Sequence, residues 1–162
     1  TIDSSTFSGN HATNTGGAIR IETDNVEIVN STISGNSSGY YGGGIYTASD
    51  LTLTFVTVTG NTQPHNLGAG LLVKGSTATV SSSIIAGNSR GGDASGMASG
   101  TLAADHSVIG FYEIAFVDNG GNVTGVADPG LGALADNGGP TLTMAPASTS
   151  PAIDREIGRA HV

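Results

Sequence analysis

The residues best suited to bind a ligand follow four Gly-Asn pairs that recur along the chain. His11 and His65 come soon after the first and third pairs, Tyr40 and Tyr41 after the second, and Arg90 after the fourth. Aromatic faces, imidazoles and a guanidinium suit the docking of a sugar chain or a protein surface. If these loops stack, the five side chains form one binding column. The alternative is ordinary variation in loops on an exposed corner.

A second candidate site consists of acidic residues. Glu22 and Asp24 lie near one predicted corner, and Asp50 lies at the matching corner of the next repeat. Carboxylate oxygens are the ligands that Ca²⁺ prefers, so these three residues are candidates for a weak calcium site. The alternative is that they only solvate the corner, because carboxylates are ordinary surface residues. We expect no other cofactor.

Composition limits the partners of the chain. Its 162 residues include 13 acidic and 5 basic side chains, a formal net charge of −8, which opposes binding to nucleic acid or anionic lipid. Cysteine is absent, which excludes disulfides and thiolate metal sites. No apolar run reaches the roughly 18 residues of a membrane span, so we expect no membrane insertion by this segment.

The Gly-Asn pairs also define an internal repeat. Their spacings are 26, 25 and 27 residues, measured at Asn10, Asn36, Asn61 and Asn88. A second, glycine-rich marker recurs at the same step and ends at Ile19, Ile45 and Leu71. Two markers with one period indicate a solenoid of repeated units. The asparagines would then either bond to one another as a ladder of stacked amides or occupy left-handed turns.

The segments between the markers alternate apolar and small polar residues, as in Val26-Glu27-Ile28 and Leu51-Thr52-Leu53. This period of two predicts short β-strands, about three per repeat. Such a unit cannot close its own sheet, but it can stack on copies of itself about 4.8 Å apart. The sequence therefore predicts an all-β parallel β-helix of about four coils with an irregular C-terminal cap, in which the three marker residues Ile19, Ile45 and Leu71 stack inward.

The regular markers end near residue 90, so we divide the chain into three parts. Residues 1–90 form the β-helix coils, residues 91–154 form a degenerate coil and the cap, and residues 155–162 form a tail. The tail ends in Ile-Gly-Arg-Ala-His-Val, which matches the translation of a common sequencing adapter. We expect this tail to be an artefact of a truncated reading frame, the alternative being a native terminus.

Five blocks in the second half resemble a known family. They follow one another in order, with Asn-Gly-Gly-Pro-Thr and Ser-Pro-Ala-Ile-Asp as the most specific, at residues 83–88, 107–110, 128–132, 136–143 and 150–154. The chain resembles the choice-of-anchor Q group of bacterial surface proteins. That resemblance implies a right-handed parallel β-helix, related to polymorphic outer-membrane protein repeats and the pectin-lyase fold, in a secreted or outer-membrane-associated protein.

We expect the chain to be a non-enzymatic structural or adhesive segment that binds a polysaccharide, or a glycan or protein of a cell surface. No catalytic residue is assigned, because the cations Arg20, Lys74, Arg90 and Arg155 fall at different phases of the repeat. The alternative is a fragment of a pectin-lyase-fold polysaccharide lyase or glycoside hydrolase whose active coils lie outside this sequence.

Overall fold

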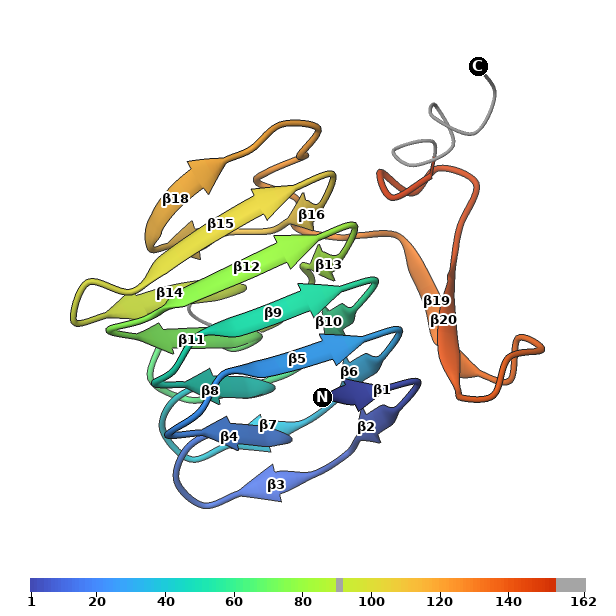
Figure 1. The fold of residues 1–162 in the computed structure, drawn as a ribbon. Coiled ribbons are helices and arrows are strands. Elements are labelled where there is room, and N and C mark those ends of the chain that lie inside the picture. Colours follow the sequence, from blue (N-terminus) through green and yellow to red (C-terminus); the bar gives the residue numbers. More distant parts are fainter. Residues whose placement is uncertain (90–91, 154–162) are drawn as a thin grey trace.

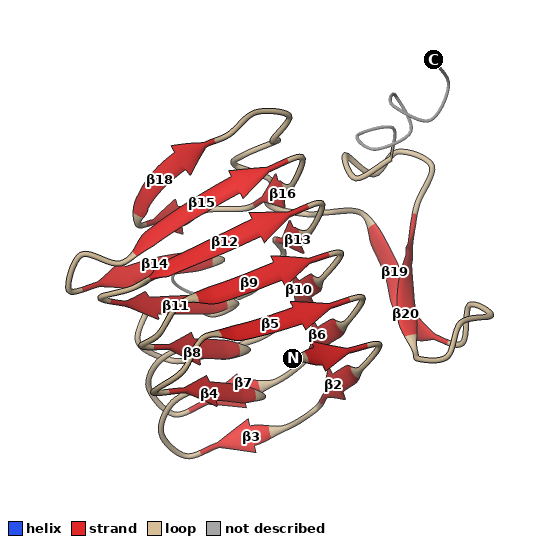
Figure 2. Ribbon diagram, in the orientation of Figure 1, coloured by secondary structure: helices blue, strands red, loops and turns tan. Residues whose placement is uncertain are grey.

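The computed structural model describes residues 1–89 and 92–153. All regular elements in those ranges are β-strands (Figure 2), which confirms the prediction of an all-β fold. Helices are absent from this described part, so no helix there is long and apolar enough to cross a membrane. Arg90, Asp154 and the predicted tail at 155–162 lie outside the described residues.

Three parallel sheets surround one core, and successive coils contribute one strand to each (Figure 1). Sheet 1 contains β1 (Ile2–Asp3), β5 (Val26–Val29), β9 (Leu51–Thr54), β12 (Thr77–Ser81), β15 (Thr101–Asp105) and β18 (Ala115–Asp118). Sheet 2 contains β2 (Thr6–Ser8), β6 (Thr32–Ser34), β10 (Thr57–Thr59), β13 (Ile84–Ile85) and β16 (Val108–Ile109). Sheet 3 contains β4 (Ile19–Ile21), β8 (Ile45–Thr47), β11 (Leu71–Lys74), β14 (Ala94–Met97) and β17 (Tyr112–Glu113). A short pair, β3 (His11–Ala12) and β7 (Ser37–Ser38), lies between sheets 2 and 3.

The core is built from rows of apolar side chains that repeat from coil to coil. Ile19 aligns with Ile45, and Ile45 with Leu71, as the second marker predicted. All three are buried, with exposed fractions of 9%, 0% and 0%. Burying each such side chain contributes about 1.5–3 kcal/mol, so these rows hold the stack together although large residues are few. The predicted parallel β-helix is therefore confirmed.

The strands of the coils continue into residues 91–154, to which we assigned a degenerate coil. Strand β14 pairs with β11 in sheet 3, β15 with β12 in sheet 1, and β16 with β13 in sheet 2. The sequence markers stop there because Ala94, Ser95 and Gly96 occupy positions that Leu71, Leu72 and Val73 fill one coil before. Small residues fit the interior here without leaving an apolar pattern in the sequence.

The terminal segment was predicted to cover the end of the stack, but it lies along its side. Strands β19 (Leu131–Ala135) and β20 (Thr143–Pro146) form an antiparallel hairpin that runs beside the first coils (Figure 1). The Thr6 hydroxyl of β2 donates a hydrogen bond of 2.9 Å to the Leu142 carbonyl. The last coil thus keeps large exposed side chains, including Phe111 at 62%.

The turn from sheet 1 to sheet 2 has the same backbone form in every coil. One residue there takes a left-handed conformation with φ of 46° to 56°; we call this set the corner column, and it consists of Ser4, Asn30, Phe55, Ser82 and His106. Serine and asparagine accept this conformation at modest cost, whereas a bulky residue does so rarely. Phe55 is therefore the unusual member of the column.

Candidate functional site

The loops that carry the predicted binding residues start from a ladder of stacked amides, which is buried at Asn36 and Asn61. The Nδ2 atoms of Asn10, Asn36 and Asn61 each donate to Oδ1 of the next ladder residue, at 3.0, 2.9 and 2.9 Å. The glycine before each ladder asparagine takes the left-handed conformation, with φ between 65° and 71°. Of the two interpretations of the repeated asparagine, the structure supports the ladder. Each loop therefore leaves the core at the same phase of the coil.

The ladder ends at Asp93, which sequence reasoning did not single out. Its Oδ1 accepts hydrogen bonds from the backbone N–H and Nδ2 of Asn88, at 2.7 and 2.9 Å, and its Oδ2 accepts one from the Phe111 N–H at 2.9 Å. Burial raises the pKa of the Asp93 carboxyl, and these hydrogen bonds act in the opposite direction. A carboxylate suits this place because both of its oxygens accept, whereas another asparagine would turn a donor toward Phe111.

The first position after each ladder asparagine forms a polar row on the outside of the stack. His11 aligns with Ser37, Ser37 with Thr62, and Thr62 with Ser89. The His11 ring lies in this row, with its Nδ1 2.9 Å from the Ser37 hydroxyl oxygen. Successive members are one interstrand spacing apart, about 4.8 Å, so the row offers evenly spaced hydrogen-bonding groups.

Three aromatic or imidazole side chains meet further along the same loops, and we call them the aromatic platform: Tyr40, Tyr41 and His65. The rings of Tyr40 and His65 stack with centroids 5.0 Å apart and an angle of 15° between their planes. Tyr41 meets Tyr40 edge to face at 6.1 Å. Tyr40 and His65 are exposed, with Tyr40 at 51%, while Tyr41 is half-buried. The platform thus exposes aromatic and imidazole surface to solvent.

A shallow hollow of about 340 Å³ lies in the loops that carry the platform. Its walls come from consecutive coils and are mostly polar: Ser38, Thr62, Gln63, Pro64 and Ser89. Gln63 Oε1 accepts a hydrogen bond of 2.5 Å from the His65 backbone N–H, which ties the floor of the hollow to the platform. A flat aromatic face beside hydroxyl and amide groups matches what an amphipathic ligand requires.

The predicted binding column is therefore divided in the structure. Tyr40, Tyr41 and His65 come together, whereas His11 lies at an earlier phase, in the row of Ser37. Arg90 lies outside the described residues, so its place relative to the platform is not defined. The division arises because a side chain one residue after the ladder and a side chain four residues after it cannot occupy the same row.

Comparison with known proteins identifies the family. A family model described as a right-handed β-helix region matches residues 1–125. The chain belongs to the right-handed β-helix family. No curated protein and no solved structure matches the chain. Membership of this family supports a surface or polysaccharide-related class of protein.

The β-helix does not gather the predicted calcium ligands. Glu22 Oε1 lies 2.5 Å from the Arg20 guanidinium, while Asp50 Oδ1 accepts a hydrogen bond of 2.9 Å from the Thr77 backbone in the following coil. Glu22 thus pairs within its own coil, whereas Asp50 bonds to the following coil. No group of three or more His, Asp or Glu side chains among the described residues is arranged to hold a metal ion. A calcium site at Glu22, Asp24 and Asp50 therefore stays a prediction.

The described cations of the β-helix lie apart from the platform and the hollow. Arg20 extends over the Tyr46 ring, 5.8 Å from its centroid, in addition to its ion pair with Glu22. Lys74 is exposed at the end of β11. At the corner column, His106 Nδ1 lies 3.3 Å from Asp105 Oδ2. Among the described residues, the arrangement around the platform thus offers stacking and neutral hydrogen bonds rather than charged groups.

Proposed function

We propose that this β-helix is a non-enzymatic, adhesive segment of a secreted or surface-anchored bacterial protein of the choice-of-anchor Q group, and that its aromatic platform binds an uncharged glycan. The observation that carries the proposal is the exposed stack of Tyr40 on His65 beside a polar hollow. The family match supports the surface or polysaccharide-related class, and the platform supplies the chemistry.

A sugar ring has a face of C–H groups and a rim of hydroxyls. The C–H face packs on an aromatic ring, while the hydroxyls need partners that both donate and accept. The Tyr40 ring provides the first, and the exposed Thr62 and Ser89 of the hollow provide the second. Because the ladder fixes where the loops begin, little conformational freedom is lost on binding.

Charge selects among glycans. The chain carries a formal net charge of −8, so an anionic polymer is repelled at moderate salt. An uncharged glycan avoids this repulsion and needs no guanidinium or ammonium groups for binding. We therefore expect neutral glycans to bind better than uronate-rich ones.

The test is a glycan array, followed by calorimetry with the neutral glycan that gives the strongest signal. The double variant Tyr40→Ala/Tyr41→Ala should lose about tenfold in affinity, since each aromatic contact contributes about 0.5–1.5 kcal/mol. Tyr40→Phe keeps the ring and is the matched control, so its affinity should stay close to that of the wild type.

Three results would contradict the proposal. They are equal binding by the wild type and the double variant, preference for anionic glycans, and release of shortened sugar chains from any polymer. The last result would instead support a lyase or hydrolase. Far-UV circular dichroism of each variant establishes that the coils remain intact.

A further inference from the structure

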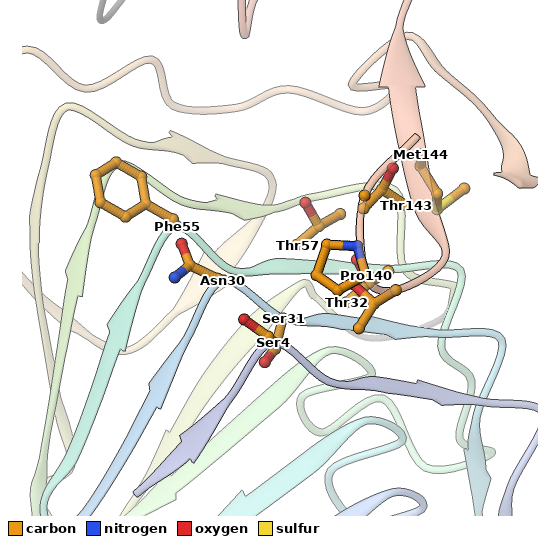
Figure 3. Close-up of a pocket in the computed structure, with 11 residues that line it drawn as sticks. Ser4, Asn30, Ser31, Thr32, Phe55, Thr57, Pro140, Thr143 and Met144 are labelled. Carbon is orange, nitrogen blue, oxygen red and sulfur yellow. The ribbon is translucent and has the colours of Figure 1, made fainter. Parts of the chain in front are cut away.

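A second cavity lies at a different corner of the β-helix, between the corner column and the terminal hairpin. Its volume is about 390 Å³, within the range of about 300–1,000 Å³ that is usual for ligand sites. One wall comes from Ser4, Asn30 and Phe55, and the other from Pro140 and Met144 (Figure 3). Residues more than eighty positions apart in the sequence thus form one groove, away from the platform loops.

Phe55 is the feature of this groove that the fold itself does not explain. Its backbone is left-handed, with φ of 56°, and its side chain is 51% exposed. The matching corner of the preceding coil holds Asn30 and that of the following coil holds Ser82, both of which suit this conformation better. A strained, exposed aromatic residue where a small polar one suffices points to a role in binding.

The floor of the groove carries hydroxyl groups that have no bonded partner. Thr6, Thr32 and Thr57 align in sheet 2, and Thr6 bonds to the Leu142 carbonyl of the hairpin. The Thr32 and Thr57 hydroxyls, which line the groove, form no hydrogen bond with any residue in the described part of the chain. In Figure 3, Thr57 lies between Phe55 and Pro140. A ligand in the groove therefore meets hydroxyls that can both donate and accept.

The groove is also uncharged. Its lining contains no Asp, Glu, Lys, Arg or His side chain among the described residues, although the chain as a whole carries a net charge of −8. A charged ligand would leave water for this groove without gaining an opposite charge. An extended peptide would find no free strand edge on the floor, because β6 and β10, which carry Thr32 and Thr57, are each paired on both sides in sheet 2.

We propose that this groove is a second carbohydrate-binding site, which takes a short stretch of an uncharged saccharide. The Phe55 ring packs on the C–H face of one sugar ring, and the Thr57 and Thr32 hydroxyls bond to its rim. The wall from Ser4 to Phe55 crosses two coil steps, about 10 Å, which limits the ligand to a short oligosaccharide. The site is independent of the aromatic platform, since it lies between sheets 1 and 2.

The test is an NMR titration of the full chain with cellobiose, xylobiose and mannobiose, and with digalacturonate as the charged probe. At least one neutral disaccharide should shift the signals of Phe55 and Thr57. Phe55→Asn should weaken that binding at least tenfold and leave the melting temperature equal or higher, because Asn30 occupies the same corner. Thr57→Val, which keeps the shape and removes the hydroxyl, should weaken it several-fold.

Tyr40→Ala is the control that separates the two sites, since it removes a platform residue and should leave the shifts at Phe55 unchanged. Loss of those shifts in Tyr40→Ala would assign the binding to the platform and overturn the second site. The inference is also overturned if no neutral disaccharide shifts the Phe55 signal or if digalacturonate binds equally well. Binding of a pentapeptide made of Gly, Ser and Thr in place of the sugars would overturn it too. Binding of a neutral disaccharide at Phe55, with no glycan binding at the aromatic platform, would support the groove as a site and contradict the proposed function of the platform.

Discussion

Replacing Asn61 with Ala should destabilise the β-helix far more than the same change at the end of the amide ladder. Asn61 is fully buried, and its Nδ2 donates to Ile33 O, Thr59 O and Asn88 Oδ1, while its Oδ1 accepts from the backbone and the amide of Asn36. The variant removes all these side-chain bonds. It leaves the Asn36 backbone N–H without its acceptor and the Asn36 Nδ2 with Phe7 O alone.

The expected magnitude follows from the bonds that are lost. A buried hydrogen bond contributes about 1 kcal/mol net, and an unpaired buried group costs about 1–3 kcal/mol. The Asn61 Nδ2 has only two hydrogens for its three acceptors, so these contacts count as about two hydrogen bonds. We therefore expect the free energy of unfolding to fall by about 3–5 kcal/mol. At the exposed end of the ladder, Asn10→Ala removes a single side-chain bond, so its loss should be at most about 1 kcal/mol.

The assay is unfolding in guanidinium chloride, followed by far-UV circular dichroism, for the wild type and both variants. The slope of the transition should stay similar, so that the shift of the midpoint measures stability. Equal losses for Asn61→Ala and Asn10→Ala would refute the reasoning, because the ladder would then contribute no more in the interior than at its end. A loss below about 1 kcal/mol for Asn61→Ala would refute it as well.

Two further predictions concern the coils. Gly43→Ala should lower the free energy of unfolding, measured by thermal unfolding, by about 3 kcal/mol or more, because the new Cβ would lie 2.4 Å from Thr62 O and 2.5 Å from Ala69 O. Gly9 has φ of 66° but open space around it, so Gly9→Ala should lower the same free energy by only about 1–2 kcal/mol. Burial raises the pKa of Asp93 in the folded state above its value of about 4 in the unfolded chain. The contribution of Asp93 to the free energy of unfolding is therefore complete below about pH 4 and is lost as pH rises through the folded-state pKa. The unfolding free energy of the wild type should therefore fall relative to that of Asp93→Asn as pH rises from about 4, and a difference that is constant with pH would contradict this.

The repeated part of the fold could be predicted because each coil repeats the same physical requirements. Asn36 and Asn61 need a partner amide one coil away, and Ile45 and Leu71 need an inner face, so the period appears directly in the sequence. The interior also tolerates small residues, and where they occur the apolar repeat is no longer visible in the sequence. Ala94 and Ser95 lie in a strand as regular as β11, yet nothing in their composition marks it.

The binding features were predictable only in part, because loops do not share the strict period of the strands. The loops after Gly-Asn were correctly placed on one side, but the contact between Tyr40 and His65 depends on their shared phase within loops of unequal length. The groove at Phe55 depends on where the hairpin packs. The hairpin is held in place by a hydrogen bond from Thr6 to Leu142, 136 residues away, and no local sequence pattern encodes this contact.

The corner column places one side chain per coil at even intervals along the stack. Each coil presents one left-handed position at the same place, and Ser, Asn, Phe and His all occupy it without changing the path of the chain. An aromatic ring moved from Phe55 to the corner of Asn30 or Ser82 would shift by one coil step, about 4.8 Å, along the stack and the hairpin beside it (Figure 1). The position of a corner ring along this wall can therefore change only in discrete steps, each one coil in size.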